Sequence, residues 1–250
     1  MFTTKITQAA RILQEARHAV ALTGAGISTP SGIPDFRSPG TGLWENIDAF
    51  EASSLEGFQR RPQVFYDWIR ARARTMRQAQ PNPAHLALAE LERRGIIKTL
   101  ITQNIDGLHV RAGSQNILEV HGHLRTLTCL KCYRQVTTES ILDQFMADGE
   151  VPRCTCGGVL KPDVVLFGEM LPVQVFHRAQ QEAETCDAML VAGSSLEVAP
   201  VSALPALALR HGAQLIIVNK MATDYDRLAR VVLHEDVAEV LPKIVEAMCK

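Results

Sequence analysis

The sequence lacks a long apolar run and an excess of charge of one sign, and we expect it to carry no export signal. No apolar stretch approaches the ~18 residues that a membrane-spanning helix needs. Residues 1–10 are mostly polar and contain no signal-peptide core, so we expect a protein of the cytoplasm. The 26 basic and 27 acidic residues leave a net charge of −1, without the basic excess that nucleic-acid-binding domains usually show. We therefore expect no membrane partner and no direct nucleic-acid binding.

Cysteines are few and clustered, which excludes a disulfide-stapled scaffold. The chain is also long enough to form a core without disulfides, because by the usual scaling of surface with length 250 residues bury about 72% of the surface that they expose when unfolded. Its 46% hydrophobic and 21% charged residues are typical of a globular protein and exclude a disordered or fibrous chain. Because four of the six cysteines lie between Cys129 and Cys156, a metal site explains them better than disulfides do.

Short apolar runs alternate with helical patterns along most of the chain. Runs typical of buried parallel strands lie at residues 19–23, 96–102, 188–192 and 215–218. Apolar residues at helical spacing lie before and between these runs, for example at residues 84–93. This alternation predicts an α/β protein with a parallel sheet.

Two segments depart from this alternation. Residues 45–78 show a more polar helical pattern with a basic end, which we interpret as a solvent-exposed helix face: Arg70, Arg72, Arg74 and Arg77. Residues 126–161 carry the clustered cysteines and indicate an inserted module.

The cysteine pairs of this module are spaced like the ligands of a structural zinc. Cys129-x-x-Cys132 and Cys154-x-Cys156 offer four thiolates, the soft donors that a tetrahedral zinc prefers. The second pair has one intervening residue where the four-cysteine ribbon pattern has two, and the spacer between the pairs is slightly long. Four reduced thiols without a metal remain the alternative. Since four thiolates leave no open position for water, we expect a structural metal and not a hydrolytic one.

Glycines follow the first predicted strand. Gly24-Ala25-Gly26 comes directly after residues 19–23, a context in which a backbone turn can approach a pyrophosphate closely. Thr29 stands where the third glycine of the usual dinucleotide fingerprint would be, and no acidic residue ends a second strand at the usual distance. The pattern alone is weak evidence for a dinucleotide, and it argues against a hydride-transferring dehydrogenase.

Polar residues also follow the other predicted strands. Gly193-Ser194-Ser195 follows one strand and Asn219 follows another. Gln103-Asn104-Ile105-Asp106 offers amide and carboxylate groups that can bind a carboxamide and sugar hydroxyls, although Asn and Asp also favour ordinary turns. Because ligands of open α/β sheets bind at the carboxyl ends of the strands, these ends together indicate a binding site.

Taken in order, these segments resemble the signature motifs of the sirtuins, which are NAD-dependent protein deacylases. The resemblance covers nearly the whole chain, from about residue 19 to residue 241. The matching motifs are GAGIS at 24–28, SGIPDFR at 31–37, TQNIDGLH at 102–109, RAG at 111–113, EVHG at 119–122, the cysteine pairs, FGE at 167–169, GSS at 193–195 and VN at 218–219. So many motifs in family order favour the functional interpretation of each one.

The resemblance implies a Rossmann-like parallel sheet with helices on both faces and a small domain made of a zinc ribbon and a helical insertion. Residues 1–35, 81–125 and 162–250 would form the Rossmann-like NAD-binding domain. Residues 36–80 would be the helical insertion and residues 126–161 the zinc ribbon. NAD and an acyl-lysine protein or peptide would meet in the cleft between the two domains.

The resemblance also assigns the site residues. The catalytic residues would be His121, Asn104 and Asp106, with His121 as the general base. Asn104, Ile105 and Asp106 would hold the carboxamide of NAD, and Phe36 would cover its nicotinamide end. The NAD-binding set would be Gly24, Ala25, Gly26, Ile27, Phe36, Arg37, Gln103, Asn104, Ile105, Asp106, Gly193, Ser194, Ser195, Asn219, Asp236 and Val237. The zinc ligands would be Cys129, Cys132, Cys154 and Cys156. The peptide would add as a strand between two edges, which contain Val164, Val165, Phe167, Gly168, Glu169, Leu196 and Val198.

The implied chemistry needs no redox step. The acyl oxygen would attack C1′ of the NAD ribose as nicotinamide leaves, giving an alkylimidate. His121 would then deprotonate a ribose hydroxyl that attacks the imidate carbon, a task suited to a side chain whose ordinary pKa lies near neutral pH. Water would complete the reaction, giving free lysine, nicotinamide and O-acyl-ADP-ribose.

The helical insertion bears on the choice of acyl group. Family members that prefer acidic acyl groups carry Tyr-x-x-Arg there, whereas Tyr66 is followed at that offset by Ile69. Arg70 lies one position later, where it can share a helix face with Tyr66. We expect removal of acetyl and other small acyl groups in preference to succinyl groups.

Other activities of the same pocket remain open. These are mono-ADP-ribosyl transfer or NAD hydrolysis, and removal of acidic acyl groups. A zinc-ribbon binding module with an inactive catalytic domain is a further alternative, which the presence of His121, Asn104 and Asp106 opposes.

Overall fold

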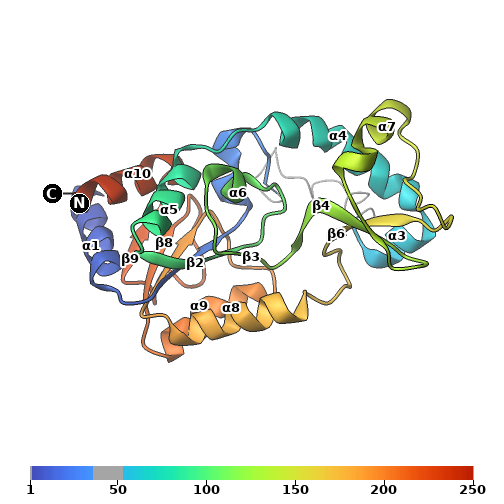
Figure 1. Ribbon diagram of the computed structural model, residues 1–250. Coiled ribbons are helices and arrows are strands. Elements are labelled where there is room, and N and C mark those ends of the chain that lie inside the picture. Colours follow the sequence, from blue (N-terminus) through green and yellow to red (C-terminus); the bar gives the residue numbers. More distant parts are fainter. Residues whose placement is uncertain (1, 36–52, 250) are drawn as a thin grey trace.

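Parallel strands form the central sheet of the computed structural model, which describes residues 2–35 and 53–249 (Figure 1). The strand order in this six-stranded sheet is β3-β2-β1-β7-β8-β9. The strands are β1 (Ala19–Thr23), β2 (Ile97–Thr102), β3 (Ile117–Glu119), β7 (Ala188–Ala192), β8 (Gln214–Val218) and β9 (Val231–Leu233). Every residue of β1 and β7 is buried, as expected for parallel strands that are covered on both faces.

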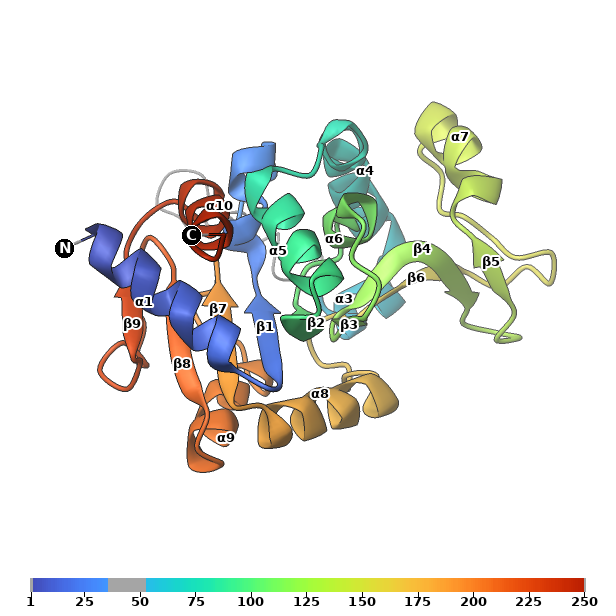
Figure 2. The same cartoon turned by 60° about the vertical axis from the view of Figure 1, so that its left-hand side comes forward.

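Helices cover both faces of this sheet (Figures 1 and 2). One face packs against α1 (Phe2–Glu15), α5 (Pro83–Arg93) and α10 (Val237–Ala247), and the other against α8 (Val173–Thr185) and α9 (Leu204–Arg210). Ala19 and Ala21 of β1 contribute to the first core and Val20 and Leu22 to the second, because successive side chains of a strand point to opposite faces. The predicted α/β fold is therefore confirmed. Within the described ranges, no helix combines the length and the apolarity that a membrane crossing requires.

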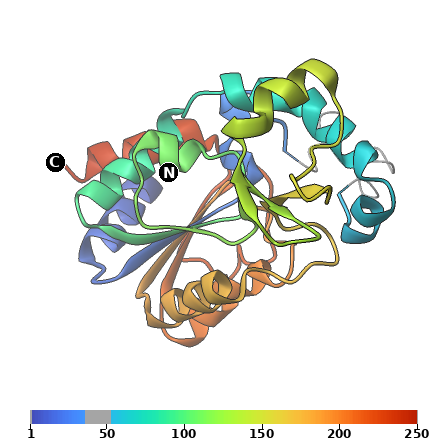
Figure 3. The same ribbon diagram turned by 45° about the vertical axis from the view of Figure 1, so that its right-hand side comes forward.

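A smaller antiparallel sheet and three helices lie beside one end of the parallel sheet (Figure 3). Its strands, in the order β5-β4-β6, are β4 (Gly122–Cys129), β5 (Gln135–Thr137) and β6 (Leu160–Val164). The helices are α3 (Leu55–Arg60), α4 (Pro62–Gln78) and α7 (Glu139–Asp148). They share one apolar cluster with β6, which contains Phe58, Phe65, Tyr66, Ile69, Phe145, Val164 and Leu166. The insertion and the cysteine module thus have a common core, while the domain boundaries stay a prediction.

The arginines of α4 do not form a uniformly exposed face, so that interpretation is wrong for two of them. Arg70 is half-buried and donates hydrogen bonds of 2.7 and 3.2 Å to carbonyl oxygens near the end of α7. Arg72 is half-buried and lies over Trp68, with its guanidinium carbon 4.4 Å from the ring centroid. Arg74 and Arg77 are exposed, as expected. The charge pattern could not separate these arginines because the helix that covers Arg70 comes much later in the sequence.

The direction of strand addition reverses between β1 and β7. β2 and β3 are added on one side of β1, whereas β7, β8 and β9 are added on the other. Such a switch point leaves a crevice outside the carboxyl ends of the strands. Two 3₁₀ turns, η1 (Ala25–Ile27) and η2 (Thr29–Ser31), follow β1 there, and α6 (Leu108–Ala112) follows β2. Another turn, η4 (Val201–Ala203), follows β7 and leads into α9.

Candidate functional site

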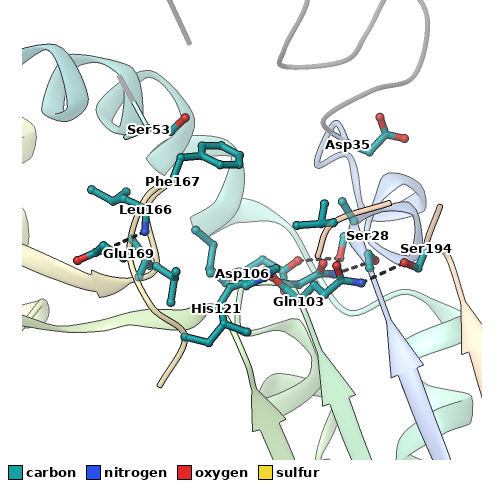
Figure 4. A pocket seen from close by; sticks show the side chains of 18 of the residues that line it. Ser28, Asp35, Ser53, Gln103, Asp106, His121, Leu166, Phe167, Glu169 and Ser194 are labelled. Carbon is teal, nitrogen blue, oxygen red and sulfur yellow. Dashed lines mark hydrogen bonds between the residues drawn. The ribbon is translucent and has the colours of Figure 1, made fainter. Parts of the chain in front are cut away.

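A cavity of about 740 Å³ opens where β1, β2, β7 and β8 end (Figure 4). A residue that follows each of these strands lines it: Gly24, Gln103, Gly193 and Asn219. Residues of α4 and of the segment after β6 line it as well. The polar strand ends therefore meet a largely apolar wall in one cavity, a common arrangement in ligand sites.

Glycines allow the turns after β1 and β7 to touch. The Gly26 N–H donates to the Gly193 carbonyl oxygen at 2.9 Å. A Cβ on Gly26 would lie 2.9 Å from that oxygen, and a Cβ on Gly193, whose φ is 62°, would lie 2.2 Å from the Ile27 nitrogen. Since only glycine fits at these positions, the turns present bare backbone to the cavity, which suits the close approach of phosphate groups.

Ser28, Asn104 and Asp106 form a hydrogen-bonded cluster in the cavity. The Ser28 hydroxyl donates to Asp106 Oδ2 at 2.7 Å, and Asn104 Nδ2 donates to the Gly24 carbonyl oxygen at 3.1 Å. The Leu108 N–H donates to Asp106 Oδ1 at 2.8 Å. Burial raises the pKa of Asp106, against the opposing effect of the hydrogen bonds from Leu108 and Ser28. The cluster offers fixed amide and carboxyl groups to the amide or hydroxyl groups of a ligand.

His121 lies between β3 and β4 and lines the same cavity (Figure 4). Its Nδ1 is 3.0 Å from the Gln103 carbonyl oxygen, which can only accept, so Nδ1 carries the proton and Nε2 of the neutral ring is a proton acceptor. In the described part of the chain, Nε2 has no hydrogen-bond partner. Burial lowers the pKa of His121, and the bond to Gln103 opposes this effect.

The residue after His121 has to be glycine. Gly122 has a φ of 74°, and a Cβ there would lie 2.0 Å from the Asp163 carbonyl oxygen. Gly122 pairs with Val164 across β4 and β6, so this contact allows the antiparallel sheet to begin directly beside His121. The glycine thereby couples the position of the ring to the small sheet.

Most residues expected to bind the peptide line the cavity. Those after or at the end of β6 are Val164, Val165, Phe167, Gly168 and Glu169, and Val198 lines it too. The Val165 N–H donates to the His121 carbonyl oxygen at 2.9 Å, which ties this segment to the histidine. Leu196 is absent from the lining, since it is 7% exposed and packs in the core with α8 and α9.

The residues expected to bind NAD divide into three groups. Those that line the cavity are Gly24, Ala25, Gly26, Gln103, Asn104, Ile105, Asp106, Gly193, Ser194, Ser195 and Asn219. Ile27 and Val237 are buried in the core instead, and Asp236 accepts a hydrogen bond of 2.8 Å from the Ala238 N–H at the start of α10. Phe36 and Arg37 lie outside the described residues.

The sequence patterns did not identify the apolar wall. Phe65, Trp68, Ile69 and Met76 of α4 line the cavity. A signal was present, because these residues repeat at helical spacing, but the same spacing is typical of residues that pack in a core. Ser28 belongs to a matching motif but had no assigned role.

Tyr66 and Arg70 share a side of α4, but this side faces β6 and α7. The Tyr66 hydroxyl donates to the Leu160 carbonyl oxygen at 2.6 Å, and Arg70 binds carbonyl oxygens near the end of α7. Neither residue lines the cavity, whereas Ile69, at the offset of the arginine in Tyr-x-x-Arg, does. The α4 wall of the cavity is therefore uncharged at this position.

The two cysteine pairs meet in the small sheet. The four sulfur atoms lie within 4.8 Å of one another, with 3.5 Å between Cys129 and Cys156 and 3.7 Å between Cys132 and Cys154. Zn–S bonds of about 2.3 Å imply S–S separations of about 3.8 Å in a tetrahedron. A Cβ on Gly158 would lie 2.6 Å from Cys129 Sγ, so bare backbone adjoins the cluster. The thiols fit a structural zinc although the second pair has a single intervening residue.

Comparisons with known proteins agree with this geometry. A model of the Sir2 family matches residues 24–200. The chain is 48% identical over 244 residues to NAD-dependent protein deacylase 2 of Archaeoglobus fulgidus, covering 97% of this chain and 95% of that protein. It is 44% identical over 239 residues to NAD-dependent protein deacetylase 1 of Geobacillus kaustophilus, covering 95% of this chain and 96% of that protein.

Solved structures are also similar. A structure concerned with the mechanism and regulation of Sir2 enzymes has a TM-score of 0.90 at 47% identity and covers 98% of both chains. A Sir2 protein bound to a myristoylated histone peptide has a TM-score of 0.84 at 43% identity, covering 98% of this chain and 96% of that one. A third, with a deacetylated p53 peptide and 3′-O-acetyl-ADP-ribose, has a TM-score of 0.90 at 38% identity, covering 96% of this chain and 97% of that one.

Proposed function

The chain belongs to the Sir2 family and is an NAD-dependent protein deacetylase, and from this premise we propose which residues carry out the reaction. The enzyme removes acetyl groups from protein lysines and forms O-acetyl-ADP-ribose. One observation carries the proposal: His121 and the Ser28–Asn104–Asp106 cluster line the same cavity.

The strand ends hold NAD, which supplies the ribose carbon that receives the acyl oxygen as nicotinamide leaves. Asn104 and Asp106 bind the carboxamide through groups that Ser28 and the backbone already orient. The backbone around Gly26 and Gly193 accommodates the phosphates, because no side chain intervenes there. Ser194, Ser195 and Asn219 contribute polar groups for the sugar hydroxyls.

His121 acts as the general base at Nε2. The Gln103 carbonyl oxygen keeps the proton on Nδ1, so Nε2 is ready to accept a proton from a ribose hydroxyl. When Nε2 takes up a proton, the same carbonyl stabilises the resulting imidazolium, because it accepts a hydrogen bond from Nδ1–H. Burial lowers the pKa of His121, which keeps the resting ring neutral at working pH.

The acyl-lysine segment adds as a strand along residues 165–168, where the Val165 carbonyl oxygen and the Gly168 backbone make no hydrogen bond to the described residues. The acyl group meets the apolar side chains of α4, where a succinyl carboxylate would lose its water without gaining a cation from this helix. The preferred acyl groups are therefore acetyl and other uncharged ones. The partners are acylated proteins of the cytoplasm.

The test is nicotinamide release from NAD with a panel of acetyl-, propionyl-, butyryl- and succinyl-lysine peptides. We expect release that depends on peptide, with little from the succinyl peptide. His121→Ala should reduce deacylation by about a thousandfold, within the range of general-base removal, and leave NAD affinity nearly unchanged. Release without peptide would instead indicate NAD hydrolysis or ADP-ribosyl transfer, and a nearly active His121→Ala would remove His121 as the base.

A further inference from the structure

Lys161 is a buried cation next to the segment that holds the peptide. Lys161 is only 8% exposed, and lysine is almost never fully buried unless it is paired. Its Nζ lies 3.0 Å from Glu169 Oε2 and donates to the carbonyl oxygens of Val164 at 2.8 Å and Pro162 at 3.1 Å. These three acceptors match the three N–H donors of the ammonium group, so the buried charge is fully paired.

Glu169 binds the same segment from its other end. Its Oε2 accepts the Leu166 N–H at 2.7 Å, as the dashed line in Figure 4 shows, and its own N–H donates to the Leu166 carbonyl oxygen at 3.0 Å. Gly168, with a φ of 88°, makes the turn that places the Glu169 carboxylate beside the Leu166 N–H. The ion pair therefore binds one backbone group on each side of Val165.

The opposite edge of this segment is bound to the catalytic histidine. The Val165 N–H donates to the His121 carbonyl oxygen at 2.9 Å. In an extended chain, the carbonyl of one residue and the N–H two residues later point to one edge, and the residue between them points to the other. The ion pair thus holds one edge of residues 164–166 while His121 holds the other.

We propose that Lys161 and Glu169 are positioning residues that set the path of residues 164–169 past His121, and so the affinity for the acyl peptide. This inference rests on the proposed function, because it assigns the segment to peptide binding. Glu169, expected from the family resemblance to contact the peptide, acts on it through the backbone that it binds. The turns that hold NAD make none of these contacts, so NAD binding is independent of the pair.

The experiment compares the KM values for acetyl peptide and NAD in Lys161→Met, Glu169→Gln and the double variant. Glu169→Gln leaves the buried Lys161 ammonium without its charged partner, and Lys161→Met does the same to the half-buried Glu169 carboxylate. We therefore expect the peptide KM to rise about tenfold while the NAD KM changes less than about twofold. The double variant leaves no unpaired charge. Its peptide KM should therefore be lower than the product of the two single effects predicts, the sign of direct coupling.

The matched control removes a charge from an exposed pair. Glu239, whose side chain is 70% exposed, pairs with Lys243 at 3.7 Å on α10, and Glu239→Gln should change neither KM. If Lys161→Met fails to fold, the test rests on Glu169→Gln, whose amide oxygen can still accept the Leu166 N–H. Hydrogen exchange of the Leu166 amide then shows whether that bond is retained.

The outcomes separate this inference from the proposed function. Peptide-dependent nicotinamide release by the unchanged protein tests the function alone. An unchanged peptide KM in both single variants, or an equal rise of both KM values, would overturn the positioning role. If the unchanged protein releases no nicotinamide, titration of the same variants with a fluorescent acetyl-lysine peptide still decides whether the ion pair controls peptide affinity.

Discussion

At the scale of the residue, the proposed chemistry depends on which nitrogen of His121 carries the proton. The Gln103 carbonyl assigns it to Nδ1, and Gln103 itself is held because its Nε2 donates to Ser194 Oγ at 3.0 Å. The end of β2 therefore orients the base and also contacts the turn after β7. A change in the side chain of Gln103 or Ser194 would therefore act on the ring through the Gln103 carbonyl.

The pKa of His121 makes a prediction about pH. Burial lowers this pKa, so the neutral ring persists to lower pH than in a free histidine, whose pKa is about 6.5. In a profile of kcat/KM for acetyl peptide against pH, activity should fall on the acid side with an apparent pKa below about 6.5. Melting temperatures at each pH control for unfolding. An acid limb above that value would contradict the assignment of His121 as the buried base.

At the scale of the element, α4 has two sides with different tasks. One side packs Tyr66 and Arg70 against β6 and α7, and the other presents Trp68, Ile69 and Met76 to the cavity. Ile69, which is 6% exposed, belongs to both the apolar core and the lining. Because the α4 side chains that line the cavity are all apolar, a charged residue at position 69 would place a charge in this wall.

Ile69→Arg should change acyl preference. A guanidinium at this position would pair with a succinyl carboxylate, so we expect kcat/KM for a succinyl peptide to rise at least about tenfold while that for acetyl peptide falls. Val64→Arg is the control, because Val64 is 36% exposed on the same helix and does not line the cavity. Equal effects of the two substitutions would show that added charge, and not its position, alters the enzyme.

The cysteine module makes a prediction about metal removal. A closed four-thiolate site contributes its binding free energy to folding, so chelation should remove zinc and lower Tm by at least about 5 °C. Cys132→Ser should reduce the zinc content, whereas Cys249→Ser should not, since Cys249 is exposed and outside the cluster. A zinc-free protein that melts at an unchanged temperature would exclude the structural role.

At the scale of the whole molecule, two buried histidines connect the site to global stability. His85 of α5 and His109 of α6 lie with ring centroids 4.8 Å apart, and His109 Nε2 is 3.0 Å from Thr23 Oγ1 at the end of β1. Burial lowers the pKa of His85 to about 4 and also lowers that of His109. Neither ring takes up a proton readily in the folded protein.

The protein should therefore lose stability as the pH falls. Between about 6.5 and 4 the unfolded chain protonates His85 and the folded chain does not, so the stabilisation present above pH 6.5 is lost as the pH approaches 4. The shift in pKa corresponds to about 3 kcal/mol. The free energy of unfolding, measured with urea at several pH values, should fall over this range, and His85→Gln should make the fall smaller, since His109 still contributes. Zinc content must be measured in parallel because acid also protonates thiolates. An equally steep slope in His85→Gln would exclude His85 as the cause.

Much of the architecture follows from local patterns in the sequence. The apolar runs at residues 19–23 and 188–192 are strands because such runs can be covered on both faces, and the cysteine spacing brings four sulfurs together. Polar residues after the strands line one cavity because the carboxyl ends of parallel strands share an edge. These features depend on neighbours in the chain or on a general rule of sheet geometry.

Only the tertiary structure decided what covers each side of an element. Helical spacing places Tyr66 and Arg70 together, but it contains no information that α7 covers them and that Ile69 faces the cavity. Motif order likewise does not reveal that Leu196 packs in the core or that Lys161 and Glu169 bind the segment between them. The physical reason is that spacing determines which side chains share a side, whereas packing between distant segments determines whether that side meets core, cavity or solvent.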